Sequence, residues 1–341
     1  MNTKAKTLQG LLAALAMGVL VLDGKTAVAA ATEGSLLCLR VVIPSLFPFF
    51  FLSSMVTEGC GGVRLLSPLL CRCGIPKGAE PIFLTGLLGG FPVGAQSICE
   101  ACGKKRLSEA QAAGLLGICN QAGPAFLFGV VAPLFSSGLC GAALWGIQTA
   151  AALLTGAIFL GKAGAASECR KEKALTASQR LSRCVRSMAY VCAWVILFRV
   201  VIAFAQRWLF FLLPLPVQIL LTGLLELTNG CLQLGLCESE AVRFALAGAM
   251  LSCGGFCVTM QTASLAAETG LSMGLYVQEK LTQSLLTAGL CALAAPLLFR
   301  NTPDSARWLC FGGFLALPAV IVFIIRKITV AKQGKLMYNR E

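Results

Sequence analysis

Residues 86–97 read GLLGGFPVGAQS and interrupt an apolar segment that covers about residues 79–99. Glycine leaves the backbone free and proline lacks an N–H donor, so this stretch cannot continue as a regular helix. Inside a bilayer, non-helical backbone costs several kcal/mol per unsatisfied polar group unless it lines a water-filled cavity or is buried in protein. We therefore expect a hairpin tip here, with Gln96 and Ser97 at the start of the helix that follows.

This tip is a candidate binding element, because the N-terminus of a half-helix favours negative charge. The candidate residues are Pro92, Gly94, Gln96 and Ser97, which would face an anionic group of a ligand. The alternative is a packing kink, in which small residues let two helices approach each other closely.

The composition of the whole chain indicates a membrane protein. Of the 341 residues, 57% are hydrophobic and only 13% are charged, and the mean hydropathy is +0.80. Soluble domains carry about 25% charged residues, so the bilayer is the expected solvent for most of the chain. The net charge of +13 comes from basic connections and tails that flank apolar segments. This pattern is typical of cytoplasmic loops and does not favour nucleic acid as a partner.

Ten apolar segments predict an all-α, multi-pass membrane protein. They cover about residues 8–31, 36–57, 79–99, 110–135, 137–161, 185–206, 208–227, 241–267, 272–298 and 306–326. We expect five parts: an N-terminal transmembrane helix (1–35), a first repeat (36–161), a basic cytoplasmic loop (162–184), a second repeat (185–298), and a C-terminal helix with a basic tail (299–341).

The N-terminus also has features of a secretory signal. Lys4 and Lys6 precede an apolar run, and Ala27-Val28-Ala29 is similar to a cleavage site. The next apolar segment begins almost at once, which favours an uncleaved first helix. If the N-terminus, the basic loop and the basic tail are all cytoplasmic, each half crosses the membrane an even number of times. Because each half has five apolar segments, we expect one segment per half to be re-entrant.

The two halves repeat one order of features. In the first half, the tip at 89–97 is followed by a polar connector and by an apolar segment that breaks at 120–124. In the second half, residues 223–230 are followed by an acidic connector and by a segment that breaks at 252–255. With the expected topology the two copies are inverted, and inverted repeats with broken helices indicate a binding site near the middle of the membrane.

The break at 120–124 supplies Asn120, Gln121 and Gly123 as candidate binding residues. The ring of Pro124 removes the helical hydrogen bond to the carbonyl of residue 120, which is then free to meet a ligand or a cation. The alternative is that the Asn and Gln side chains hydrogen-bond to neighbouring helices.

Glu226 lies in an apolar context with Thr228 and Asn229 beside it, and a carboxylate inside a membrane is a functional hypothesis by default. Its expected role is coupling to H⁺ or Na⁺. The alternatives are an ion pair with Arg199 or another buried base, and a position nearer the membrane interface.

The fourth break adds Gly255, Gln261 and Thr262, which would complete a polar cavity opposite Gln96 and Asn120. Hydrogen bonding between helices is the alternative for these residues too.

An enzyme is not expected. The sequence has no histidine, which excludes His-dependent triads, His-ligated zinc and histidine proton relays. The 17 cysteines are mostly in apolar runs, where a thiol packs as a small hydrophobic group, and the Cys99–Cys102 spacing has no second pair with which to form a metal site. We expect no cofactor, no metal and no catalytic residue.

Several of these blocks resemble the YlbJ-like sporulation integral membrane proteins, in order and spacing, over about residues 10–300. The resemblance is carried by VIPSLFPFF (42–50), GFPVGAQ (90–96), CNQAGPAF (119–126), GLLELTNG (223–230) and Gly254-Gly255 with Gln261. The family belongs with the nucleoside-recognition or gate-domain proteins. This implies an architecture similar to that of the concentrative nucleoside transporters.

The resemblance implies a role in endospore formation, with dipicolinic acid moved across the outer forespore membrane. The leading hypothesis is a transporter or facilitator of a small organic anion in the cell membrane or that forespore membrane. The alternatives are a non-transporting structural or assembly protein of sporulation, and a nucleoside or nucleobase transporter. The expected partners are the small anion and the lipid bilayer, and a homo-oligomer is compatible with the sequence.

The chain departs from the family pattern at two places. The family has Lys where this chain has Gln96, which removes the most obvious counter-charge for a dicarboxylate. It also has a second Asn and a Ser where this chain has Gln121 and Ala122.

Overall fold

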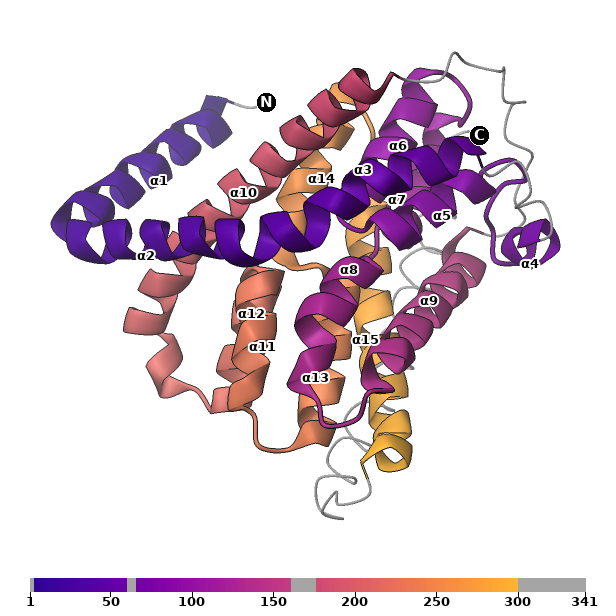
Figure 1. Cartoon of the computed structure of the whole chain (residues 1–341). Helices are drawn as coiled ribbons and strands as arrows, with labels where there is room; N and C mark the ends of the chain where they lie inside the picture. The colour runs from indigo at the N-terminus through magenta and orange to yellow at the C-terminus, as the bar shows by residue number, and fades with distance from the viewer. Residues whose placement is uncertain (1–2, 60–65, 161–175, 300–341) are drawn as a thin grey trace, which may run out of the picture.

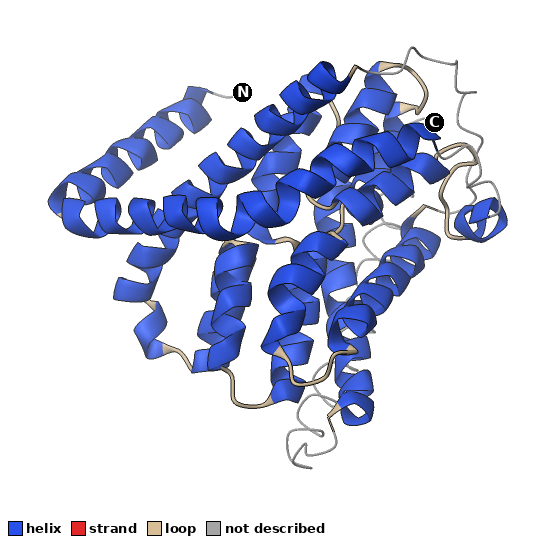
Figure 2. Cartoon of the chain, viewed as in Figure 1, coloured by secondary structure: helices blue, strands red, loops and turns tan. Residues whose placement is uncertain are grey.

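The protein is helical throughout the part that the computed structural model describes, residues 3–59, 66–160 and 176–299 (Figures 1 and 2). No β-strand is present in these three ranges. Most of the predicted basic loop (162–175) and almost all of the predicted C-terminal helix and tail (300–341) lie outside the described residues.

The N-terminal region consists of two helices that meet at Asp23, and the chain is helical across residue 35. Helix α1 covers Thr3–Leu22 and α2 covers Gly24–Leu37, and the Asp23 carboxylate caps α2 by accepting from the Thr26 N–H at 3.4 Å. Aspartate is a preferred N-cap, whereas Gly34 is tolerated inside α2, where it packs closely against α10. The chain therefore continues from α2 through a π-helical turn into α3 (Ile43–Gly59), as the long rod across the front of Figure 1.

The first half then contains a short helix, a helical hairpin, a broken helix and a long helix. The elements are α4 (Ser67–Arg72), α5 (Glu80–Gly89), α6 (Val93–Gly103), α7 (Glu109–Cys119), α8 (Pro124–Phe126) with its continuations η3 (Leu127–Val131) and η4 (Ala132–Leu134), and α9 (Cys140–Phe159). The predicted hairpin tip lies between α5 and α6, and the predicted break at 120–123 lies between α7 and α8.

The second half opens with a long helix and then repeats the order of hairpin, broken helix and long helix. The elements are α10 (Ala177–Trp208), η5 (Phe210–Leu212), α11 (Leu215–Leu225), α12 (Leu227–Gln233), η6 (Leu234–Leu236), α13 (Glu240–Cys253), α14 (Gly255–Thr269) and α15 (Gly274–Leu298). In Figure 1, α5, α6 and α7 lie around the right-hand end of the rod formed by α2 and α3, and α8, α11, α12 and α13 lie below the rod.

Glycines let the helices of each half approach at backbone distance. A Cβ atom on Gly94 would lie 2.0 Å from the Cys119 carbonyl oxygen, and one on Gly230 would lie 2.2 Å from the Gly223 Cα atom. No side chain can be added there without moving backbone, so these glycines hold each hairpin against its neighbouring segments.

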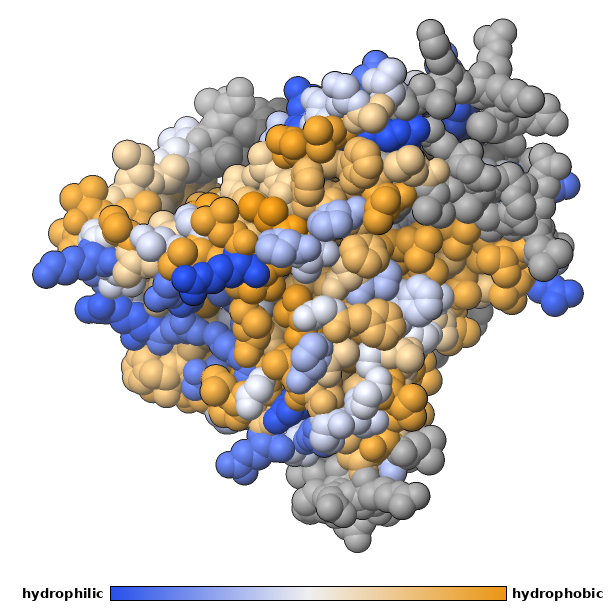
Figure 3. All heavy atoms as spheres, in the orientation of Figure 1, coloured by the Kyte–Doolittle hydropathy of each residue, from blue (hydrophilic) through white to orange (hydrophobic). Residues whose placement is uncertain are grey.

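The molecule is a multi-pass membrane protein. Five helical stretches of the described residues are long and apolar enough to cross a bilayer: Gly24–Leu52, Glu109–Leu134, Cys140–Phe159, Ala177–Trp208 and Glu240–Thr269. Large apolar side chains are exposed on several helices, and apolar residues cover much of the face in Figure 3, with most strongly hydrophilic residues toward its edges. A surface of this kind requires lipid as its solvent.

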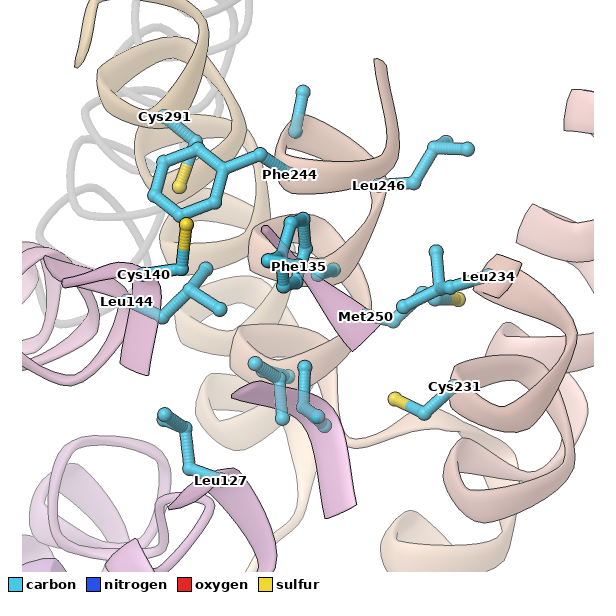
Figure 4. Close-up of a cluster of buried hydrophobic side chains, with 14 of the residues drawn as sticks. Leu127, Phe135, Cys140, Leu144, Cys231, Leu234, Phe244, Leu246, Met250 and Cys291 are labelled. Atoms are coloured by element: carbon cyan, nitrogen blue, oxygen red, sulfur yellow. The ribbon is translucent and has the colours of Figure 1, made fainter. Parts of the chain in front are cut away.

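The buried side chains form three clusters that surround the helix breaks. One lies among α5, α6 and α7, one between α10 and the α2–α3 rod, and the largest among η3, α12, α13 and α15. In the largest, Phe244 makes an edge-on contact with Phe135, with ring centroids 5.7 Å apart (Figure 4). It makes a second edge-on contact with Phe299, at 5.8 Å between centroids. This close packing makes the half-helices that end at the breaks rigid.

Candidate functional site

The helix breaks of the two halves meet around one small cavity of about 40 Å³. Its wall takes Phe91 from the first hairpin tip, Gly123 from the α7–α8 break, Glu226 from the α11–α12 break and Gln261 from α14. The other lining residues are Val42, Leu46, Ala122, Phe126, Val191, Val195, Leu227, Thr228 and Val258. Four of the predicted binding residues, Gly123, Glu226, Thr228 and Gln261, therefore share this cavity.

Glu226 closes the N-terminus of α12. Its carboxylate accepts hydrogen bonds from the Thr228 N–H at 3.0 Å, the Asn229 N–H at 2.8 Å and the Asn229 side-chain amide at 2.7 Å, and the residue is only 2% exposed. The negative charge thus sits at the positive end of the α12 dipole. The ion pair with Arg199 that we considered is not formed, because Arg199 binds Glu33 on α2 instead.

Asn120 joins the broken helices of the two halves. It is fully buried, and its side-chain amide donates to the Thr262 hydroxyl at 2.9 Å. The Tyr276 hydroxyl lies 3.5 Å from the same Thr262 oxygen. Two predicted residues that are 142 positions apart in sequence are therefore in direct contact.

Gln121 turns back onto the end of α7. Its side-chain amide donates to the carbonyls of Gly117 and Ile118 at 3.0 and 2.8 Å and to the side-chain oxygen of Gln283 at 2.9 Å. The amide of Gln148 on α9 donates to the Ala122 carbonyl at 3.0 Å. Buried amides thus satisfy carbonyls that the break leaves without helical donors.

A buried lysine that the sequence analysis did not select lies at the same break. Lys280 on α15 is 2% exposed, and its ammonium donates to the Asn120 carbonyl at 2.5 Å and to the Gln283 side-chain oxygen at 3.2 Å. The ammonium also lies 5.2 Å from the centroid of the Phe91 ring, which lines the cavity. The Asn120 carbonyl, which we expected to be free for a ligand or a cation, is bound by the ammonium of Lys280.

The neighbouring Glu279 is buried completely and accepts from the Gly117 N–H at 3.1 Å. Two adjacent charged residues inside the apolar segment 272–298 could have identified this part of the site from the sequence. The sequence analysis counted the segment only as apolar and so missed Glu279 and Lys280.

Gln96 lies apart from the cavity. It accepts from the Ser187 hydroxyl at 3.0 Å and donates to Glu100 at 3.3 Å, and Arg183 binds both Glu100 oxygens at 3.0 Å. This network links α6 to α10. Ser97 is half-buried beside it on α6.

The remaining predicted residues shape the backbone. Pro92 is the buried N-cap of α6, and Gly94 packs against the backbone of Cys119 and Asn120. Gly255 has a φ of +74°, and a Cβ atom there would lie 2.8 Å from the Gly223 carbonyl oxygen, so this position requires glycine both for its conformation and for space.

Among the described residues, no group of three or more His, Cys, Asp and Glu side chains could hold a metal ion. The described cysteines, including Cys99 and Cys102, are free thiols, and several are fully buried within the core clusters.

Comparison with known proteins agrees with the class of multi-pass membrane protein. Over 98 residues, the chain is 34% identical to the sporulation integral membrane protein YlbJ of Bacillus subtilis (strain 168). The match covers 27% of this chain and 24% of that protein, about a quarter of the relative's length. No protein-family profile matches the chain, and no solved structure matches it.

Proposed function

We propose that this chain is a transporter or facilitator of a small organic anion in spore formation, with dipicolinate as the first substrate to test. The observation that carries the proposal is the meeting of three helix breaks and α14 around one cavity, with Glu226 in its wall and Lys280 next to Phe91. Broken helices at corresponding places in two repeats are typical of secondary transporters that bind near the middle of the membrane. The similarity to a sporulation integral membrane protein supports the biological setting.

The charges around the cavity support an anionic substrate. Lys280 supplies a buried positive charge next to Phe91 in the cavity wall. Glu226 occupies the N-terminus of α12, where a substrate carboxylate would find N–H donors. A substrate carboxylate would compete with Glu226 for these donors, so we infer that the Glu226 side chain moves away when the substrate binds.

The size of the cavity indicates a closed arrangement. A volume of about 40 Å³ holds about three water molecules, which is less than a small organic anion requires. We infer that the first hairpin tip, with Phe91, and the Glu226 break move apart to admit the substrate. If the two repeats are inverted, as the topology predicts, the same movement in the opposite sense would open the other side.

Uptake of radiolabelled dipicolinate into proteoliposomes that contain the full chain tests the proposal. We expect uptake above that of empty liposomes, and a loss of at least tenfold in Glu226→Ala and in Asn120→Ala. The matched control is Glu33→Gln, which removes a half-exposed carboxylate that does not line the cavity. Uptake that persists in both cavity variants would show that the site is wrongly assigned.

A second pair of assays separates the alternatives. Uptake of labelled uridine in place of dipicolinate would favour a nucleoside transporter. Normal dipicolinate content in spores of a deletion strain, with defective spore assembly and no uptake of either compound, would favour a structural protein.

A further inference from the structure

The C-terminal end of α7 has the chemistry of a cation site. The helix ends at Cys119. In a continuous helix the Asn120 carbonyl would accept from the N–H of residue 124, but residue 124 is a proline and has no N–H. The end of a half-helix carries partial negative charge, and unwound carbonyls at such ends coordinate cations in membrane proteins.

Oxygen acceptors outnumber donors around this end. The Asn120 carbonyl and the Gln283 side-chain oxygen both contact the Lys280 ammonium. The side-chain oxygens Oδ1 of Asn120, Oε1 of Gln121 and Oε1 of Glu279 are buried there without a hydrogen-bond partner. The ring face of Phe91 adds a further electron-rich surface, 5.2 Å from the ammonium. Without Lys280, this set of oxygen acceptors would have no positive charge to bind.

We propose that Lys280 is a tethered cation, which permanently occupies a site at the α7–α8 break that would otherwise bind a monovalent metal ion such as Na⁺. The ammonium reaches the site from α15, 160 positions along the chain, and makes the direct oxygen contacts that a dehydrated ion would make. The protein therefore needs no Na⁺ to hold the break together. The consequence for transport rests on the proposed function and is that substrate movement is independent of Na⁺.

Thermal unfolding of the purified full chain in detergent tests the site without a substrate. The melting temperature is measured in NaCl, KCl and choline chloride at equal ionic strength. We expect the wild-type protein to melt at the same temperature in all three salts. We expect Lys280→Ala to melt lower in choline chloride and to recover by about 5 °C in NaCl when the ion is in large excess over its Kd.

Three variants make the assignment specific. Lys280→Arg keeps the charge and should not respond to Na⁺. The double variant Lys280→Ala with Gln283→Leu removes one oxygen ligand and should lose most of the recovery. Arg207→Ala removes an exposed cation that pairs with Asp23 at 3.3 Å on the surface, and it should behave as wild type.

Two results would overturn the proposal. One is a wild-type protein that NaCl stabilises over choline chloride. The other is a folded Lys280→Ala protein that no alkali cation stabilises. If Lys280→Ala does not fold in any salt, the wild-type comparison decides: equal melting temperatures support the tethered cation, and stabilisation by NaCl rejects it.

Transport provides the separate readout. Wild-type proteoliposomes should take up dipicolinate equally in sodium and choline buffers, and a requirement for Na⁺ would reject the proposal. If no substrate is taken up but the melting pattern holds, the proposed function fails and the tethered cation stands.

Discussion

Two helix breaks face the same cavity, and the chain closes them by different means. At the α11–α12 break, Glu226 binds the N–H groups of residues two and three positions further on. At the α7–α8 break, Lys280 and Gln283 reach the exposed carbonyls from α15, more than 150 positions away. The α11–α12 break contains the charged group that binds its free N–H groups, whereas the α7–α8 break receives its charged group from α15.

The difference separates local folding from assembly. The Glu226 cap can form as soon as residues 226–229 adopt their turn, because every partner is near in sequence. At the α7–α8 break, the Gln121 amide covers the Gly117 and Ile118 carbonyls locally. The Asn120 carbonyl, in contrast, is bound by Lys280, which reaches it only when α15 packs. In a membrane the cost of an unsatisfied carbonyl is several kcal/mol, so docking of α15 completes the first half of the molecule.

The largest effect should come from the backbone contacts that hold the hairpins at both breaks. Gly230→Ala would place a Cβ atom 2.2 Å from the Gly223 Cα, and backbone on both sides prevents relief. We expect a loss of about 4 kcal/mol or more and little monodisperse protein in size-exclusion chromatography. Gly235→Ala is the matched control, since its Cβ meets nothing within 4 Å. Equal yields of the two variants would contradict this packing.

Removal of the distant counter-charge should have the next largest effect. Lys280→Ala leaves the Asn120 carbonyl and the Gln283 oxygen without the ammonium in a buried site. We expect the free energy of unfolding in choline buffer to fall by about 3 kcal/mol. Chemical denaturation in detergent measures it. A change below about 1 kcal/mol would mean that the first break does not depend on α15.

Removal of the local counter-charge should cost less. Glu226→Ala leaves two backbone N–H groups and the Asn229 amide without their acceptor, and we expect a loss of about 2 kcal/mol. Glu226→Gln keeps one carbonyl acceptor and should lose about half as much. If Glu226→Ala proves more harmful than Lys280→Ala, the ranking of local and distant closure is reversed.

The smallest effect should come from a charge pair at the surface. Arg207 near the end of α10 and Asp23 before α2 also join segments far apart in sequence, but they lie at the ends of the membrane-crossing stretches and the Arg207 side chain is 59% exposed. We expect Arg207→Ala to change the free energy of unfolding by less than about 1 kcal/mol. A larger loss would show that distance along the chain matters more than burial.

The positions of the breaks could be predicted because their causes are local. Gly90, Pro92 and Pro124 lie at breaks, where glycine and proline combine with polar neighbours, whereas the lone Pro48 lies inside α3. Glu226 followed by Thr228 and Asn229 forms a cap from neighbouring atoms. The division at Asp23 was not predicted, although an N-cap residue marks it, because hydropathy alone joined α1 to the start of α2.

The members of the site could be predicted only in part. Asn120 and Thr262 were both selected, but their contact depends on how α7 packs against α14. Gln96 was selected for its place in the first helical turn of α6, and it faces α10 because the orientation of that helix turns it away from the cavity. Lys280 was missed because segment 272–298 was assessed by its average hydropathy, and the charged residues within it were not considered individually.

The sequence alone determined that this is a membrane protein, because the hydropathy of its residues requires a lipid environment. It also determined where the helices break, because the effects of glycine and proline on the backbone are local. It also determined the cap at Glu226, whose partners are adjacent. Only the tertiary structure decided that the breaks meet at one cavity and that the positive charge there is Lys280. The reason is that a buried ammonium must find its oxygens in space, and here the Asn120 carbonyl oxygen lies 160 positions away in the sequence.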